Sequence, residues 1–89
     1  SQGDYAKALE YYNKSLEILL SVLGERHPYV AASYNNIGSI YRRQGNYSMA
    51  LKYYKSSYDI LKDFLPDEHP NIKTVRGNIE YLKSKINKQ

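Results

Sequence analysis

Histidine and acidic side chains are the residues of this chain whose types suit metal binding or proton transfer. His27 and His69 are the only histidines, and each stands directly before a proline, with Glu25, Asp67 and Glu68 nearby. Equivalent points on neighbouring packed helices lie about 10 Å apart, which is too far for two histidines to share one zinc ion. We therefore expect no metal site. Hydrogen bonding at a helix start explains the histidines, and the acidic residues suit helix N-termini.

Nucleophilic and phosphate-binding chemistry also lacks its usual motifs. The chain has no cysteine, and its serines are scattered without the glycine-rich elbow of a hydrolase. No glycine-rich phosphate loop and no paired inward carboxylates are recognisable in the sequence. We therefore expect no enzymatic activity and no cofactor.

The amino-acid composition bears on which classes of partner the chain could bind and on the cellular compartment in which it is expected. The 89 residues carry a formal net charge of +4, and eleven of the twelve aromatic residues are tyrosines. Tyrosines in a basic chain could stack on single-stranded RNA, but most of them stand at helix-packing spacings, so core packing explains them first. No apolar run approaches the roughly 20 residues of a membrane span. The absence of cysteine favours a reducing compartment, and we expect an intracellular, cytoplasmic location.

The strongest pattern is an internal repeat. The stretch GDYAKALEYY from Gly3 returns as GNYSMALKYY from Gly45, and the same 42-residue offset superimposes His27-Pro28 on His69-Pro70. A fixed period of this length indicates stacked helical units that each rely on a neighbour to cover an apolar face.

The apolar spacing predicts four antiparallel helices and no strand, near residues 4–22, 29–43, 46–64 and 71–87. Asp4 and Asn46 are predicted N-caps, and Gly24 and Pro66 are predicted to end the first and third helices. A second apolar line on the first helix, formed by Tyr11, Ser15, Ile18 and Val22, predicts that this helix is covered on two sides.

These features resemble the tetratricopeptide repeat, in particular the long 42-residue variety of kinesin light chains and related bacterial arrays. The resemblance covers the whole chain and rests on Tyr34, Ile37, Gly38, Tyr41, Gly45, Tyr47, Ala50, Tyr54 and Ser57, together with the connector LGERHPYVA. Of these, the predicted repeat-packing residues are Tyr34, Ile37, Gly38, Tyr41, Ala50 and Tyr54, with Ala8 and Tyr12 as the earlier copies of Ala50 and Tyr54. It implies an all-α, right-handed solenoid in which the small Gly38 and Ala50 let two helices approach closely. Ser57 stands where the family usually has alanine, a departure from which we expect little consequence.

The order of the helices within the repeat leads to a separate expectation for each end of the chain. In the family's order the chain reads second helix, first helix, second helix, first helix, so it forms one segment that we expect to be part of a longer array. In the last helix Arg76, Glu80 and Lys83 replace packing residues, which predicts that helix 71–87 is a polar cap; random divergence is the alternative. At the other end we expect the apolar strip of Tyr5, Ala8, Leu9 and Tyr12 to be uncovered and to mediate self-association.

The resemblance also implies a function and a surface. Such arrays are non-catalytic interaction modules that bind a peptide or partner helix on a concave face, which would here contain Asn35, Asn36, Ser39, Arg42, Arg43, Asn78, Tyr81 and Lys85. Asn36 and Asn78 would bind a ligand's backbone or link neighbouring helices, and both readings stay open. Arg42, Arg43 and Lys85 favour an acidic ligand, although cations also suit helix C-termini. A self-associating structural array or spacer is the main alternative function, and an RNA-binding helical repeat is a less favoured one.

Overall fold

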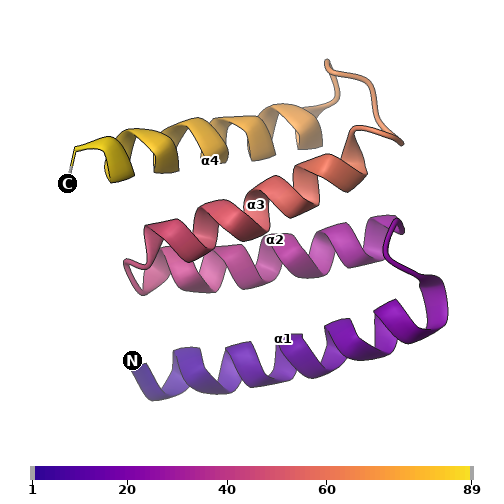
Figure 1. Cartoon of the computed structure of the whole chain (residues 1–89), viewed down its shortest axis with the longest axis horizontal. Coiled ribbons are helices and arrows are strands. Elements are labelled where there is room, and N and C mark those ends of the chain that lie inside the picture. The colour runs from indigo at the N-terminus through magenta and orange to yellow at the C-terminus, as the bar shows by residue number, and fades with distance from the viewer. Residues whose placement is uncertain (1, 89) are drawn as a thin grey trace.

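The computed structural model describes residues 2–88, which form four helices that follow one another through a flat slab of about 35 × 31 × 16 Å (Figure 1). They are α1 (Gln2–Leu23), α2 (Pro28–Arg43), α3 (Tyr47–Leu61) and α4 (Pro70–Asn87). Each helix runs antiparallel to the next, and every regular element between residues 2 and 88 is helical. The all-α, TPR-like helical repeat fold predicted from the sequence is confirmed.

The starts of three helices follow from single side chains. His27 and His69 precede α2 and α4, and their Nδ1 atoms accept hydrogen bonds from the backbone N–H of Tyr29 and Asn71, both at 3.0 Å. Asn46 precedes α3, and its side chain accepts from the backbone N–H of Met49 at 3.3 Å. These bonds satisfy N–H groups that the first helical turn leaves without a partner. The helix-start role predicted for the histidines is confirmed.

The helix ends agree with the sequence at the glycines and differ elsewhere. Gly24 and Gly45 adopt left-handed backbone with φ of 85° and 82°, directly after α1 and shortly after α2. The prediction for α3 was wrong by three residues, because it ends at Leu61 and not at 64. Its last turn tightens through the bonds from Asp63 N–H to the Ile60 carbonyl and from Phe64 N–H to the Leu61 carbonyl, well before Pro66.

The start of α1 also differs from the prediction. This helix begins at Gln2, so Asp4 lies within its first turn and is not the N-cap. Gly3 lies within α1 and does not have the left-handed backbone seen at Gly24 and Gly45. The acidic side chain of Asp4 still suits this position, because the N-terminal end of a helix carries partial positive charge.

The core forms two clusters that share α3. In the first cluster α3 contributes Ile60, which packs with Leu16 of α1 and Ile37 of α2. In the second, Ala50 and Tyr54 of α3 pack against Val75, Ile79 and Leu82 of α4. Helix α3 thus covers the groove between α1 and α2 with one face and supports α4 with the other.

Small residues set the closest helix contact. Gly38 of α2 is buried, and a Cβ built on it would lie 3.3 Å from the carbonyl oxygen of Ala50 and 3.4 Å from Cδ1 of Tyr54. Ala50 is fully buried and Tyr54 is 2% exposed. The sequence argument that Gly38 and Ala50 permit a close crossing therefore agrees with the geometry.

Ser57 makes a buried contact that the sequence argument underestimated. Its hydroxyl donates a 2.8 Å hydrogen bond to the carbonyl oxygen of Ala31 on α2, and the side chain is fully buried. An alanine could not make this bond. The departure from the usual family residue therefore adds a specific link between α2 and α3.

The outer face of α1 is exposed, contrary to the prediction that this helix is covered on two sides. Tyr11, Ile18 and Val22 are 69%, 64% and 72% exposed. Leu9 and Tyr12, which we expected in an uncovered strip with Tyr5 and Ala8, pack instead against the first core cluster, and Tyr5 and Ala8 are half-buried. The exposed apolar surface of α1 therefore lies beside the predicted strip, because α2 covers the strip itself.

Candidate partner-binding surface

Arg42 of α2 contacts Asn78 and Tyr81 of α4, and residues of both helices line two hollows, so α2 and α4 contribute to one face of the molecule. The first hollow, of about 450 Å³, lies near the starts of α2 and α4. We call it the apolar groove, and its lining residues are Pro28, Ala32, Asn35, Ser57, Leu61, Phe64, Leu65, Asn71, Thr74 and Val75. Apolar side chains dominate its lining, with the amide groups of Asn35 and Asn71 among them, which suits an apolar side chain held within a hydrogen-bonded peptide.

The second hollow, of about 390 Å³, lies near the end of α2 and is lined by Ser39, Arg42, Arg43, Tyr47 and Tyr81. The guanidinium of Arg42 lies 4.9 Å from the ring centroid of Tyr81, and Nζ of Lys85 lies 5.5 Å from it. We call Arg42, Arg43, Tyr81 and Lys85 the cationic cluster. Cation–ring contacts hold the Arg42 and Lys85 side chains over one aromatic surface, so their charges are concentrated at one end of the face.

The structure brings most of the predicted partner-binding residues onto this face. Asn35 lines the apolar groove, and Ser39 lines the second hollow with members of the cationic cluster. Oδ1 of Asn78 lies 3.5 Å from Nη1 of Arg42, a long contact that links α4 to α2. Asn36 is exposed on α2 and lines neither hollow.

A charged contact outside the two hollows escaped the sequence argument. Arg26, in the connector between α1 and α2, binds the carboxylate of Asp59 at 2.6 Å, the backbone carbonyl of Asp59 at 2.7 Å, and the carboxylate of Asp63. The hydrogen bond from Arg26, with a further one from Lys62, holds the pKa of Asp59 below its usual range. The bonds to Asp59 and Asp63 raise the pKa of Arg26 in turn. We call this group the connector clamp, because it fixes the end of α3 against the preceding connector.

Some tyrosines pack between helices, and others are exposed to solvent. Tyr53 stacks on Tyr41 with ring centroids 5.7 Å apart and lies 5.9 Å from Tyr34. Burial raises the pKa of Tyr34, and the negative charge of Glu25 adds to this effect, so this hydroxyl stays protonated at neutral pH. These three rings act as packing residues between α2 and α3, whereas Tyr11, Tyr29 and Tyr81 are exposed.

The described residues contain neither a cluster of metal-ligating side chains nor a helix that could span a membrane. Residues 2–88 contain no group of three or more His, Cys, Asp or Glu side chains placed to hold a metal ion. Of the four helices, none combines the length and apolar character that crossing a membrane requires.

The repeat geometry agrees with a comparison against protein families. A family model described as a tetratricopeptide repeat matches residues 1–63 of the 89. The chain belongs to the tetratricopeptide repeat family. No curated protein matched the sequence.

Membership of the tetratricopeptide repeat family gives the fold a general role. Proteins of this family generally mediate protein–protein interactions and are typically non-catalytic scaffolds. The matched residues contain α1, α2 and α3, and α4 lies beyond them. The 42-residue spacing of this tetratricopeptide segment is compatible with the kinesin-light-chain-like variety, which remains a prediction.

Proposed function

We propose that the chain is a protein-interaction module that binds an extended peptide across the face formed by α2 and α4. The ligand places an apolar side chain in the apolar groove and an acidic group at the cationic cluster. The convergence of Arg42 and Lys85 on the ring of Tyr81 is the observation that carries this proposal. It concentrates positive charge beside an apolar hollow on one face, which favours an acidic ligand.

The amide side chains along this face supply the remaining recognition. Asn35 and Asn71 line the apolar groove from opposite helices, so a peptide lying between α2 and α4 passes within reach of both. An amide offers a donor and an acceptor without a charge to desolvate, which suits a peptide backbone. The contact between Asn78 and Arg42 supports the alternative that Asn78 links two helices.

A matched pair of peptides tests the proposal. The probe is a fluorescein-labelled peptide with one Leu followed by two Glu residues, flanked by prolines that keep it extended, and the control probe carries Gln in place of Glu. Fluorescence anisotropy should show tighter binding of the acidic probe, and Arg42→Gln with Lys85→Gln should weaken it by about tenfold, the sum of two partly exposed ion pairs. Lys52→Gln, on α3, serves as the matched control variant. Equal binding of both probes would refute the acidic specificity.

Asn36→Ala with Asn78→Ala separates the two roles of the asparagines. A ligand-binding role predicts weaker binding of the acidic probe with an unchanged melting temperature. An internal link predicts a lower melting temperature. Circular dichroism on the same samples makes this comparison direct.

Self-association is the second candidate function, and the exposed apolar face of α1 favours it. Tyr11, Ile18 and Val22 are largely exposed on one side of this helix. Burying such a face against a second copy would remove apolar surface from water. Sedimentation velocity over a concentration series tests this candidate, and a monomer at every concentration would exclude it.

A further inference from the structure

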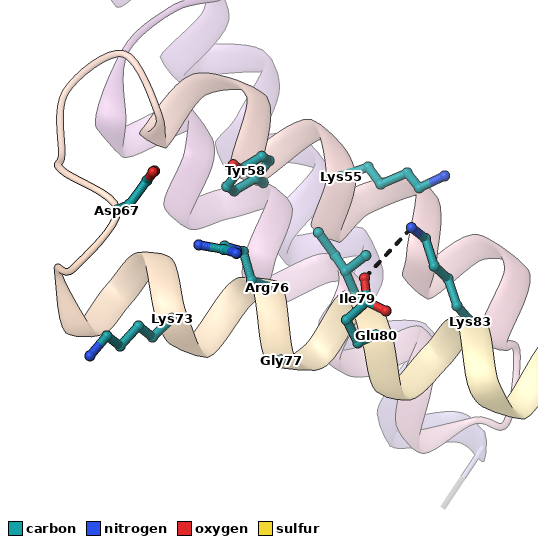
Figure 2. Close-up of a pocket in the computed structure, with 9 residues that line it drawn as sticks. All are labelled: Lys55, Tyr58, Asp67, Lys73, Arg76, Gly77, Ile79, Glu80 and Lys83. Atoms are coloured by element: carbon teal, nitrogen blue, oxygen red, sulfur yellow. Dashed lines mark ion pairs between the residues drawn. The ribbon is translucent and has the colours of Figure 1, made fainter.

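A second groove lies on the opposite end of the stack from α1, between α3 and α4. It has a volume of about 710 Å³ and is lined by Lys55, Tyr58, Asp67, Lys73, Arg76, Gly77, Ile79, Glu80 and Lys83. Figure 2 shows Arg76 and Lys83 rising from α4 into the space beside α3, with Lys55 and Lys83 directed to the same end. We call it the α3/α4 groove, and no part of residues 2–88 fills it.

The repeat itself shows what such a groove is shaped to hold. One period earlier, its residues correspond to positions on α1 and α2, with Leu16 in place of Tyr58 and Ile37 in place of Ile79. There α3 fills the equivalent groove, because Ile60 packs against Leu16 and Ile37 in the first core cluster. The α3/α4 groove therefore has the backbone geometry of a site that receives a helix.

Its chemistry differs from that of the earlier groove. On α2 the positions that contact α3 include Ala31, Tyr34, Gly38 and Tyr41, and on α4 these become Lys73, Arg76, Glu80 and Lys83. The carboxylate of Glu80 lies 3.7 Å from Nζ of Lys83 and is about three-quarters exposed. An apolar helix of the α3 type would bury these charges without partners, which is strongly unfavourable.

The balance of charge in the α3/α4 groove is positive. Lys55, Lys73, Arg76 and Lys83 face only Asp67 and Glu80 among its acidic residues. Gly77 adds open space, since a Cβ built there meets no atom within 4 Å. The groove therefore offers room for a helix whose contacting side chains are acidic.

The connector between α3 and α4 indicates in which direction a helix bound in the α3/α4 groove would run. In the first unit Arg26 holds the end of α3 through Asp59 and Asp63. One period later Glu68 occupies the position of Arg26. We consider a helix that lies in the α3/α4 groove in the same orientation as α3 lies between α1 and α2. Its C-terminal end would be near the negative charge of Glu68, and its earlier turns would be near the positive charges of Lys73, Arg76 and Lys83.

We propose that the α3/α4 groove docks an α-helix of a partner protein that presents acidic side chains to Lys73, Arg76 and Lys83 and a basic side chain to Glu68. This order of charge also agrees with the helix dipole, which favours acidic residues early and basic residues late in a helix. The groove is separate from the α2/α4 face, and the proposal does not depend on peptide binding there.

Stapled helical peptides of the length of α3, 15 residues, provide the probe, because free peptides of this length are marginally helical. The acidic probe carries Glu at the positions of Tyr53, Ser56 and Ser57, which on α3 lie beside Tyr41, Tyr34 and Ala31, the earlier counterparts of Lys83, Arg76 and Lys73. It carries Arg at the position of Asp59, which Arg26 binds, and the control probe carries Gln at all four positions. Fluorescence anisotropy with the whole chain should give about tenfold tighter binding of the acidic probe, from three partly exposed ion pairs. The difference should shrink as salt is raised.

Variants assign the binding to the groove. Arg76→Gln with Lys83→Gln should weaken the acidic probe toward the affinity of the Gln probe, while Lys52→Gln leaves it unchanged. Arg76→Glu with Lys83→Glu should reverse the preference and favour a probe in which Lys replaces the three Glu residues. This reversal is a result that loss of folding cannot produce, and the exposed positions of Arg76 and Lys83 make unfolding unexpected.

Four results would overturn the proposal. The first is equal affinity for the acidic and Gln probes. The second is loss of acidic-probe binding in Arg42→Gln with no loss in Arg76→Gln, which would place the helix on the α2/α4 face. The third is displacement of the probe by a single-stranded RNA oligonucleotide together with direct binding of that RNA. The fourth is a change in oligomeric mass when Arg76 and Lys83 are replaced, which would make a second copy the occupant.

Discussion

Gly38 of α2 lies directly against Ala50 of α3, so closely that a Cβ on Gly38 would stand 3.3 Å from the Ala50 carbonyl oxygen. The same Cβ would lie 3.4 Å from Cβ of Tyr53 and 3.4 Å from Cδ1 of Tyr54. A backbone carbonyl in a packed helix does not move away as a flexible side chain would. The separation of α2 and α3 therefore depends on the missing side chain at Gly38.

Gly38→Ala is expected to destabilise the fold by about 1 kcal/mol, because overpacking of about 1–3 kcal/mol exceeds the gain of about 1 kcal/mol in helix propensity. Gly77→Ala is the matched control, since Gly77 is also helical and a Cβ there meets no atom within 4 Å. That variant should gain about 0.5–1 kcal/mol. Urea unfolding measures both. Equal stabilisation by the two substitutions would show that the crossing relaxes freely.

Ser57→Ala should cost about 1 kcal/mol through loss of the buried hydrogen bond to the Ala31 carbonyl. Ser15 occupies the same place one period earlier on α1 and is half-buried, so Ser15→Ala serves as the control for the change in helix propensity. The difference in unfolding free energy between the two variants isolates the bond. No difference would mean that the hydroxyl contributes nothing to packing of α2 on α3.

His27→Ala should destabilise the fold by about 1 kcal/mol, because the backbone N–H of Tyr29 loses the Nδ1 acceptor at the start of α2. His27→Asn should retain most of the stability, since asparagine is a favourable cap. Thermal unfolding followed by circular dichroism compares the three proteins. Equal melting temperatures for the alanine and asparagine variants would contradict the capping role.

The connector clamp predicts a specific dependence of stability on pH. The pKa of Asp59 is lowered in the folded state by Arg26 and Lys62, so its contribution is present above the unfolded aspartate pKa of about 3.9 and is lost as the pH falls through the folded value. Arg26→Gln should therefore be less stable than the unaltered chain at pH 7, and the gap should narrow below about pH 4. Urea unfolding across this range measures the gap. A gap independent of pH would assign the role of Arg26 to packing.

The sequence was sufficient for most helix limits because these depend on local features, and the family resemblance added the tight crossing of α2 and α3. Proline after His27 and His69 and glycine at positions 24 and 45 mark helix limits through backbone conformation alone. Gly38 was recognised through the resemblance to the tetratricopeptide repeat, which implies a small residue at this crossing. The helix limits required no knowledge of which side chains meet across the fold.

Other features depend on tertiary contacts that the repeat did not reveal. The end of α3 at Leu61 reflects a tightened turn, and proline at position 66 marks only where a helix could not continue. The connector clamp joins residues 33 and 37 positions apart, and the period concealed it because Glu68 replaces Arg26 in the next unit. The groups that form the cationic cluster were selected by resemblance, but their convergence on Tyr81 appears only in the fold.

The exposed face of α1 leads to the last prediction, which concerns how two copies would meet. On α3 the equivalent side chains Tyr53, Ser57 and Ile60 pack against α2 and its neighbours, so the same face of α1 is shaped to contact a helix. Stacking of one copy on the α4 end of another would place this apolar face on Lys73, Arg76 and Lys83 of the α3/α4 groove, where burial of charge opposes it.

Association should therefore occur between the α1 faces of two copies, which gives a closed two-fold dimer and no extended filament. Ile18→Glu with Val22→Glu should abolish it, because each copy would then bury two carboxylates against the other. Tyr29→Glu, at an exposed aromatic residue on α2, should leave association unchanged, as should Arg76→Gln. Sedimentation velocity distinguishes these cases. Species larger than a dimer that disappear in Arg76→Gln would establish head-to-tail stacking and refute the two-fold arrangement.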